Sequence, residues 1–209
     1  MKKKVSVSIL SSKNIIEDLI DLESTDVDYI HIDVMDRKFV KNKFDPFKTL
    51  YRMSYILTKR LDVHLMVEKP LKYIEKYSTL NTEYITIHVE LGDDKINECF
   101  NLIKSYGIKF GLSIRPNTDI KLLEKYLDKI DLILIMSVEP GLGGQLFIEG
   151  TTERLDNIKK MIGKRKICIN VDGGINDKTI SKVEKSDIVV SGSYIINGDN
   201  FQDMVDSLR

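Results

Sequence analysis

Short runs of mostly apolar residues recur along the chain at nearly even intervals, and a segment with helical spacing follows each one. These runs predict eight strands, at positions 5–10, 29–35, 61–67, 83–89, 108–114, 131–138, 166–171 and 187–192. Their length and their content of Ile, Val and aromatic residues are typical of buried strands. The run at 131–138, DLILIMSV, is almost continuously apolar, as expected of a parallel strand that is buried on both faces.

The segments between the runs predict helices. The first is expected to begin at Asn14, because Glu17 follows at the spacing of a capping box. Its buried face is predicted to consist of Ile16, Leu19 and Ile20. Further helices are predicted near positions 46, 70, 96, 119, 155, 177 and 201.

Eight strand–helix units in a chain of 209 residues predict an α/β fold, a single (β/α)₈ TIM barrel that spans residues 1–209 as one domain. The alternative is an open, doubly wound sheet. The barrel is favoured because polar residues lie at the ends of the second, third and seventh predicted strands. A barrel brings those three ends to one mouth, whereas in an open sheet they would seldom all meet. Barrel active sites lie at that end of the strands.

Composition excludes several partners. The 32 Lys and Arg residues balance 32 Asp and Glu residues, so nothing indicates binding to nucleic acid or to an anionic membrane. The apolar run after the basic N-terminus stops at Leu10, too short for a signal peptide, and no run reaches the ~20 residues of a membrane span. Cys99 and Cys168 are interpreted as buried thiols in a reducing compartment. We therefore expect a cytoplasmic protein.

Candidate metal ligands lie at three strand ends. His31 and Asp33 share one face of the strand at 29–35, because alternate strand residues point the same way. His64 occupies a similar position in LDVHLMV, and Asp172 ends the run INVD. Each residue alone is more often an ordinary hydrogen-bonded strand end. Together, two histidines and two aspartates predict one divalent-metal site.

Glycines suggest a phosphate site. They follow the sixth, seventh and eighth predicted strands, and the set comprises Gly141, Gly143, Gly144, Gly173, Gly174 and Gly192, with Ser193 beside the last. One glycine-rich segment is more often just a tight turn. Three that converge at a barrel mouth can direct backbone N–H groups at a phosphate.

Met35 and Met66 each follow a candidate ligand by two residues on the same face. A methionine on a strand is more often core filling, but this placement favours a position at the site. His88 also ends a strand, and we interpret it as lying behind the site or at the surface rather than as a ligand.

The segments HIDVMD, DVHLMV, ITIHVE, MSVEPGLGGQLF and VDGGI, in this order, resemble the ribulose-phosphate 3-epimerase family. The resemblance runs from Ser8 to Ser193 and so covers nearly the whole chain. It implies a (β/α)₈ barrel that inverts C3 of D-ribulose 5-phosphate to give D-xylulose 5-phosphate. It also implies a homo-oligomer.

The resemblance assigns roles to individual residues. It implies that His31, Asp33, His64 and Asp172 hold one divalent ion, commonly zinc, with manganese, iron or cobalt as alternatives. Asp33 and Asp172 correspond to the acid/base pair. The expected substrate contacts come from Ser8, His64, Met35, Met66, Met136 and the glycines with Ser193.

The chemistry agrees with these roles. Inverting a carbon next to a ketone needs one group to remove its proton and another to return a proton on the opposite face, which suits two carboxylates. A metal ion would stabilise the enediolate between the two transfers. The sequence leaves open which aspartate is the base for which epimer.

Two positions depart from the family pattern. Arg37 and Lys41 stand where glycine and proline are usual, in the segment that leaves the second strand. A glycine position with positive φ would strain Arg37. Three functions therefore stay open: a pentulose 5-phosphate 3-epimerase, an epimerase of a hexulose 6-phosphate or of a sugar-polymer pathway, and a sugar-phosphate-binding protein without catalysis. The paired aspartates argue against the last.

Overall fold

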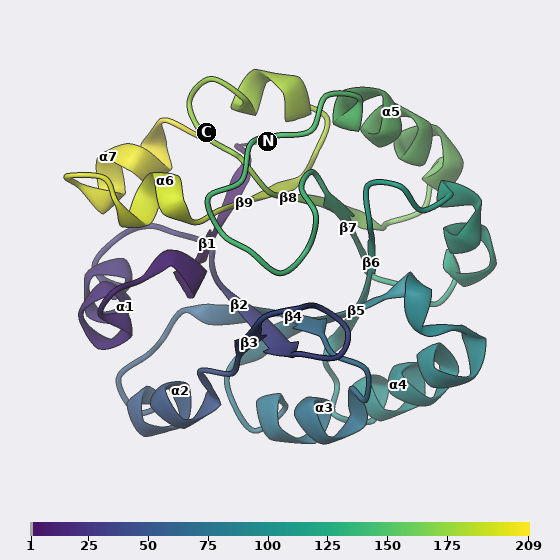
Figure 1. Ribbon diagram of the computed structural model, residues 1–209, viewed down its shortest axis with the longest axis horizontal. Coiled ribbons are helices and arrows are strands. Elements are labelled where there is room, and N and C mark those ends of the chain that lie inside the picture. The colour runs from purple at the N-terminus through teal and green to yellow at the C-terminus, as the bar shows by residue number, and fades with distance from the viewer. Residues whose placement is uncertain (1) are drawn as a thin grey trace.

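Eight parallel strands close into a barrel in the computed structural model, which describes residues 2–209 (Figure 1). They are β1 (Lys4–Ser8), β2 (Tyr29–Asp36), β4 (Arg60–Met66), β5 (Thr82–His88), β6 (Lys109–Ile114), β7 (Leu132–Met136), β8 (Cys168–Asp172) and β9 (Ile188–Ser191). The order β1-β9-β8-β7-β6-β5-β4-β2 is closed by pairing of β1 with β2. The (β/α)₈ barrel predicted from the sequence is confirmed, and the open sheet is excluded.

A short strand, β3 (Lys43–Phe44), pairs antiparallel with the end of β2 and was not predicted. Its two residues carry no alternation that sequence reasoning can detect. The turn between the two strands, residues 37–42, is called the β2–β3 loop below. The Arg37 N–H donates to the Asn42 carbonyl (2.9 Å), and Arg37 has φ +65°.

The helices form the outer ring in Figure 1. The α-helices are α1 (Ile15–Glu23), α2 (Phe47–Met53), α3 (Leu71–Tyr77), α4 (Asp93–Ser105), α5 (Thr151–Ile162), α6 (Ser193–Ile196) and α7 (Phe201–Asp206). Short 3₁₀-helices are η1 (Ile9–Ser11), η2 (Val89–Leu91), η3 (Ile120–Tyr126) and η4 (Ile180–Val183). The helices predicted near positions 119 and 177 are therefore 3₁₀-helices, η3 and η4. Within residues 2–209, no helix combines the length and the apolar character needed to cross a membrane.

The buried face of α1 differs from the prediction. Leu19 is buried as expected, but Ile16 and Ile20 are 53% and 50% exposed. The buried face instead consists of Leu19 and Leu22, and Ile15 packs against the core beside them. Ile15, Leu19 and Leu22 have helical spacing too, so the periodicity permitted both faces, and docking on the barrel selects one.

Asn14 occupies the N-cap of α1, yet the predicted capping box does not form among the described residues. Its side-chain amide donates to the Glu17 carboxylate (2.6 Å) rather than accepting from a backbone N–H. The start of the helix was therefore predicted correctly and its capping contact was not.

The barrel interior changes from apolar to polar along its axis. On β2 the inward face carries, in order, Tyr29, His31, Asp33 and Met35, because strand side chains alternate. Tyr29 belongs to an apolar cluster with Tyr84, Leu132 and Ile188. Closer to the carboxyl ends of the strands, the neighbouring strand β4 places Asp62 beside His31 and His64 beside Asp33. The sheet thus gathers its ionisable side chains near the carboxyl ends of the strands.

Candidate active site

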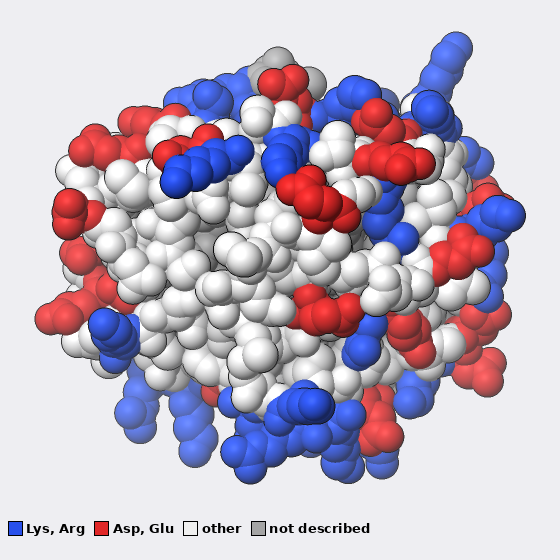
Figure 2. All heavy atoms as spheres, turned by 45° about the horizontal axis from the view of Figure 1, so that its top comes forward, with Lys and Arg blue, Asp and Glu red and all other residues white. Residues whose placement is uncertain are grey.

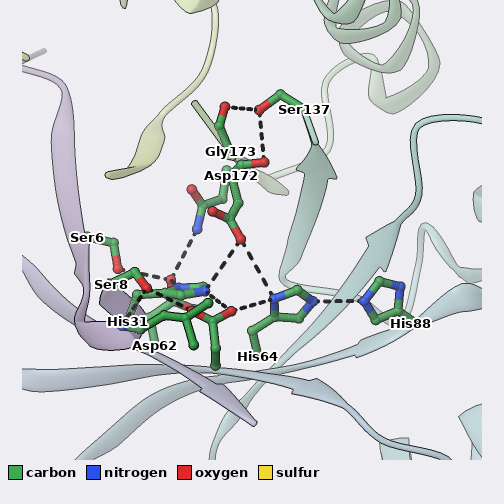
Figure 3. A network of polar contacts seen from close by, with 12 residues as sticks. Ser6, Ser8, His31, Asp62, His64, His88, Ser137, Asp172 and Gly173 are labelled. Atoms are coloured by element: carbon green, nitrogen blue, oxygen red, sulfur yellow. Dashed lines mark hydrogen bonds and ion pairs between the residues drawn. The ribbon is translucent and has the colours of Figure 1, made fainter. Parts of the chain in front are cut away.

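Four side chains from β2, β4 and β8 converge inside the mouth of the barrel (Figure 3). They are His31, Asp33, His64 and Asp172, called the donor cluster below, and one donor atom from each lies within 4.8 Å of the others. His31 Nε2 lies 3.6 Å from Asp33 Oδ1 and 3.7 Å from Asp172 Oδ2. His64 Nδ1 lies 3.5 Å and 3.8 Å from the same two oxygens.

The donor cluster fits a divalent metal ion. His31 Nε2 and His64 Nδ1 are buried, and neither has a hydrogen-bond partner within residues 2–209. Such unpaired buried atoms are costly unless something else satisfies them. Four N and O ligands at ~2.1 Å around one ion in a tetrahedral arrangement lie about 3.4 Å apart. The observed separations are close to this value, so the cluster can bind a divalent metal ion.

Asp62 orients the His31 ring. His31 Nδ1 lies 2.9 Å from Asp62 Oδ2, and the same oxygen accepts from Ser6 Oγ and Asn170 Nδ2, each at 3.1 Å. In the neutral ring Nδ1 therefore carries the proton, and the lone pair of Nε2 faces the cluster. Asp62 was not among the residues predicted from the sequence. The signal was available, because Asp62 and His64 alternate on β4 in the way that His31 and Asp33 do on β2.

His88 lies behind His64. Its Nε2 is 2.9 Å from His64 Nε2, and its Nδ1 is 3.0 Å from Glu90 Oε2. His88 is fully buried, so it lies behind the site as one of the two expected alternatives, not at the surface. Its contact with His64 and the part played by Glu90 were not predicted.

The two aspartates have different electrostatic environments. Burial would raise the pKa of Asp33, but attraction to the His31 and His64 imidazoles beside it holds the pKa well below its usual range. Ser8 Oγ also donates to Asp33 Oδ2 (2.8 Å). Burial raises the pKa of Asp172 to about 6, with attraction to His31 opposing the rise and repulsion from Asp33 adding to it. One carboxylate is thus held as an anion, while the other can carry a proton near neutral pH.

The charge of His31 is coupled to the same groups. Burial lowers the pKa of His31, but the Asp62 and Asp33 carboxylates outweigh it and raise the pKa well above the usual value. A proton and a metal ion would compete for Nε2, because a histidine ligand binds in its neutral form.

A cavity of about 350 Å³ opens above the donor cluster. Most of the substrate contacts expected from the sequence line it: Ser8, Asp33, Met66, Met136, Gly141, Gly143, Gly144, Asp172, Gly173, Gly174, Gly192 and Ser193. His31 and His64 lie deeper, fully buried. Met35 packs against Met66 and Val40 rather than against the cavity. The structure adds Gln145, Asn176, Tyr194 and Asn197 to the wall.

The loop between β7 and α5 covers part of the mouth, as the green segment in Figure 1 shows. At its base, Ser137 Oγ donates to the carbonyls of Asp172 (2.8 Å) and Gly173 (2.6 Å). Gln145 Nε2 ties the loop to itself by donating to the carbonyls of Glu139 and Leu142. The space-filling view shows this face as largely uncharged, with charges of both signs around its rim (Figure 2).

Gly174 permits a close approach of two loops. It has φ +64°, and a Cβ at this position would lie 2.5 Å from the Phe147 backbone nitrogen. Any side chain would therefore push the β7–α5 loop away from the segment after β8. The two walls of the cavity meet at this contact.

The β2–β3 loop borders the same region. Asn42 Nδ2 donates to the Gly141 carbonyl (2.8 Å) and so ties this loop to the β7–α5 loop. Arg37 and Lys41 line a neighbouring cavity of about 580 Å³, which shares the segment 139–142 with the cavity above the donor cluster. The positive φ of Arg37 is the strained geometry expected at a family glycine.

Comparison with known proteins identifies relatives. A model of the Ribulose-phosphate 3 epimerase family matches residues 4–196. The ribulose-phosphate 3-epimerase of Buchnera aphidicola subsp. Baizongia pistaciae is 39% identical over 219 residues, covering 100% of this chain and 96% of that protein. The enzyme of the same name from Bacillus subtilis (strain 168) is 32% identical over 213 residues, covering 99% and 98%.

Solved structures with lower identity share the fold. KGPDC from Streptococcus mutans has a TM-score of 0.72 at 12% identity and covers 100% of this chain and 96% of that chain. Phosphoribosyl anthranilate isomerase from Thermococcus kodakaraensis has a TM-score of 0.66 at 16% identity, covering 99% and 97%. At these identities the likeness extends to the barrel alone.

The contact at Gly174 generates a stability prediction. Gly144→Ala, where φ is +71° and the added Cβ meets nothing within 4 Å, serves as the control. It should cost about 1 kcal/mol of unfolding free energy through backbone strain alone. Gly174→Ala should cost a further ~1–3 kcal/mol, because the new methyl overlaps the Phe147 backbone. Urea unfolding of both variants measures the difference, and equal losses would contradict the close approach.

Proposed function

Because the chain belongs to the ribulose-phosphate 3-epimerase family, we propose that it interconverts D-ribulose 5-phosphate and D-xylulose 5-phosphate with the help of one divalent metal ion. The observation that carries the proposal is the placement of Asp33 and Asp172 on one donor cluster, at the floor of a cavity with glycine-rich walls. Two carboxylates suit the removal of a proton from one face of a carbon atom and the return of another proton to the opposite face.

The substrate is proposed to lie between the glycine-rich loops and the aspartates. Gly173, Gly174, Gly192 and Ser193, after β8 and β9, offer backbone N–H groups to the phosphate, at the position common in barrels. The reacting carbons would then lie over Asp33 and Asp172. Met66 and Met136 line the cavity beside them and exclude water from the reaction. A cavity of about 350 Å³ suits a small sugar phosphate.

Each turnover moves two protons. One aspartate accepts the proton from C3, and the electrons of the broken C–H bond form the C2–C3 double bond of an enediolate. The other aspartate gives its proton to the opposite face of C3, which restores the ketone with inverted configuration. Without the ion, the pKa of Asp33 lies below its usual range and that of Asp172 above it, so the two carboxylates differ in proton affinity. The reverse reaction exchanges their roles.

His31, Asp33, His64 and Asp172 would hold the ion. When bound, a divalent ion supplies Lewis-acid stabilisation of the charge that develops on the C2 oxygen, worth several kcal/mol. Ser8 holds Asp33 in place through the hydrogen bond to Oδ2, while Asp62 and His88 hold the two histidines.

Removal of metal should abolish most of the activity. Protein stripped by a chelator should lose about 100-fold or more in kcat, as expected when several kcal/mol of charge stabilisation is lost. Zinc, manganese, iron or cobalt added in turn identifies the ions that restore it, and we expect zinc to be among them. Undiminished turnover in protein shown to be metal-free by elemental analysis would contradict the metal site.

The two-carboxylate mechanism makes an isotopic prediction. In ²H₂O the product should gain one deuterium at C3, because the returning proton comes from a different aspartate. Asp33→Asn and Asp172→Asn should each lower kcat by roughly 10²–10⁴-fold. Elemental analysis of each variant separates loss of the ion from loss of proton transfer.

These variants also assign the base. A variant that keeps its ion and one working aspartate should exchange the C3 hydrogen of one epimer with solvent and not that of the other. Full retention of the substrate hydrogen in the product of the parent enzyme would exclude the two-base mechanism.

A hexulose 6-phosphate is the second candidate substrate, because the β2–β3 loop departs from the family pattern at Arg37 and Lys41. Both residues are exposed near the mouth, where loops set the specificity of barrels. Arg37→Gly with Lys41→Gln should lower kcat/KM for the true substrate by roughly two- to tenfold at low salt, because local positive charge speeds the capture of anions.

The matched control is Lys164→Gln with Lys166→Gln, which removes the same charge just before β8, at the opposite end of the barrel. Both double variants should match the parent at about 1 M salt, where the Debye length is only about 3 Å. The measurements use ribulose 5-phosphate and allulose 6-phosphate. If the mouth variant equals the parent on both substrates at low salt, the two cations have no part in substrate capture.

A further inference from the structure

A chain of polar contacts leads from the donor cluster through His64 to His88 (Figure 3), and continues from His88 to Glu90. His64 presents Nδ1 to Asp33 and Asp172, and its Nε2 lies 2.9 Å from His88 Nε2. His88 Nδ1 in turn lies 3.0 Å from Glu90 Oε2. Both imidazoles are fully buried, away from bulk water.

The direction of these hydrogen bonds follows from the chemistry of imidazole. If His64 Nδ1 offers a lone pair to an ion, its Nε2 must carry the proton of the neutral ring. That N–H donates to His88 Nε2, which must then be an acceptor. His88 therefore carries its own proton on Nδ1 and donates it to the Glu90 carboxylate. Every nitrogen of both rings has a use in this arrangement.

Glu90 is held as the fixed end of the chain. Its other oxygen, Oε1, accepts from the Arg115 backbone N–H (3.0 Å) and from Thr118 Oγ1 (2.6 Å). The side chain of Phe39 covers the outer part of the chain, with its ring centroid 4.7 Å from that of His88, and the Arg115 guanidinium stacks on Phe39 at 4.5 Å. An anchored carboxylate sets which nitrogen of His88 is protonated, and His88 sets the same for His64.

We propose that His88 and Glu90 are positioning residues that hold His64 in the tautomer and orientation needed to bind the metal ion. The proposal rests on the metal site of the proposed function. It parallels the direct hydrogen bond from His31 to Asp62, with one imidazole inserted between ligand and carboxylate.

The position of the His88 ring between His64 and Glu90 has an electrostatic explanation. Asp33, Asp172 and Asp62 already place three carboxylates around the two histidine ligands. A fourth directly on His64 would add repulsion in a region of low dielectric constant. Because neutral His88 lies between His64 and Glu90, it orients His64 by a hydrogen bond while keeping the charge of Glu90 one ring farther from the donor cluster.

Zinc affinity tests the assignment without depending on turnover. The zinc Kd of the purified parent and its variants is measured by competition with a chromogenic chelator. His88→Leu should weaken binding by about 10–100-fold, the usual effect of removing the partner of a histidine ligand. His88→Gln should retain most of the affinity, because its amide can accept from His64 and donate to Glu90.

Thr86→Val is the matched control. Thr86 lies two residues before His88 on the same face of β5, is fully buried, and its hydroxyl has no partner within residues 2–209. Its zinc affinity should equal that of the parent. If His88→Leu also binds zinc as tightly as the parent, the positioning role is wrong, while the metal site stands. A parent that binds no divalent ion would overturn the metal site and the positioning role together.

Nitrogen-15 NMR gives a second readout, and its main test uses the zinc-loaded parent alone. His64 should be protonated on Nε2 and His88 on Nδ1, with both N–H protons protected from exchange. In Glu90→Gln the protonation of His88 should no longer be restricted to Nδ1, because the amide can donate as well as accept. A zinc-loaded parent with the proton of His64 on Nδ1 would overturn the proposal.

Discussion

The structure depends on a concentration of buried charge that the barrel alone cannot neutralise. Asp33 and Asp62 are buried and Asp172 is nearly so. Within residues 2–209, the groups that contact their carboxylates are two imidazoles and a few neutral donors from Ser6, Ser8 and Asn170. Burying ionised carboxylates costs several kcal/mol each unless they are paired. The raised pKa of Asp172 is a direct expression of that cost. A divalent cation among the four donors would lower this free-energy cost. The same pair of carboxylates beside a cation is what proton abstraction next to a ketone requires.

The rest of the fold holds this arrangement in place. Register between β2 and β4 puts His31 beside Asp62 and Asp33 beside His64, so three members of the donor cluster and the carboxylate that orients His31 follow from a single strand pairing. Asp172 comes from the opposite wall and is fixed through its backbone by Ser137. Because these groups lie on strands rather than on loops, their positions are as rigid as the sheet.

Sequence reasoning succeeded where local alternation decides the outcome. The pattern of His31 and Asp33 on one face needs only the two-residue period of a strand, and the eight predicted strands lie within about two residues of those observed. It failed where a choice depends on distant contacts. Ile16 and Ile15 offered equally good helical faces, and docking of α1 decided between them. The partnership of His88 with His64 depends on how β4 and β5 pair, which no local pattern contains.

The β2–β3 loop, which departs from the family pattern at Arg37 and Lys41, contacts both the cavity wall and the residues behind His64. Asn42 ties it to the Gly-rich wall of the cavity, and Phe39 from the same loop packs on His88 and Arg115. A change at Arg37 or Lys41 therefore has two routes to the site, through the electrostatic potential at the mouth and through the packing that shields the His64–His88–Glu90 chain. The first is screened by salt and affects substrate capture. The second is insensitive to salt and would affect the binding of a metal ion to the donor cluster. Salt dependence therefore distinguishes the two routes, although one loop carries both.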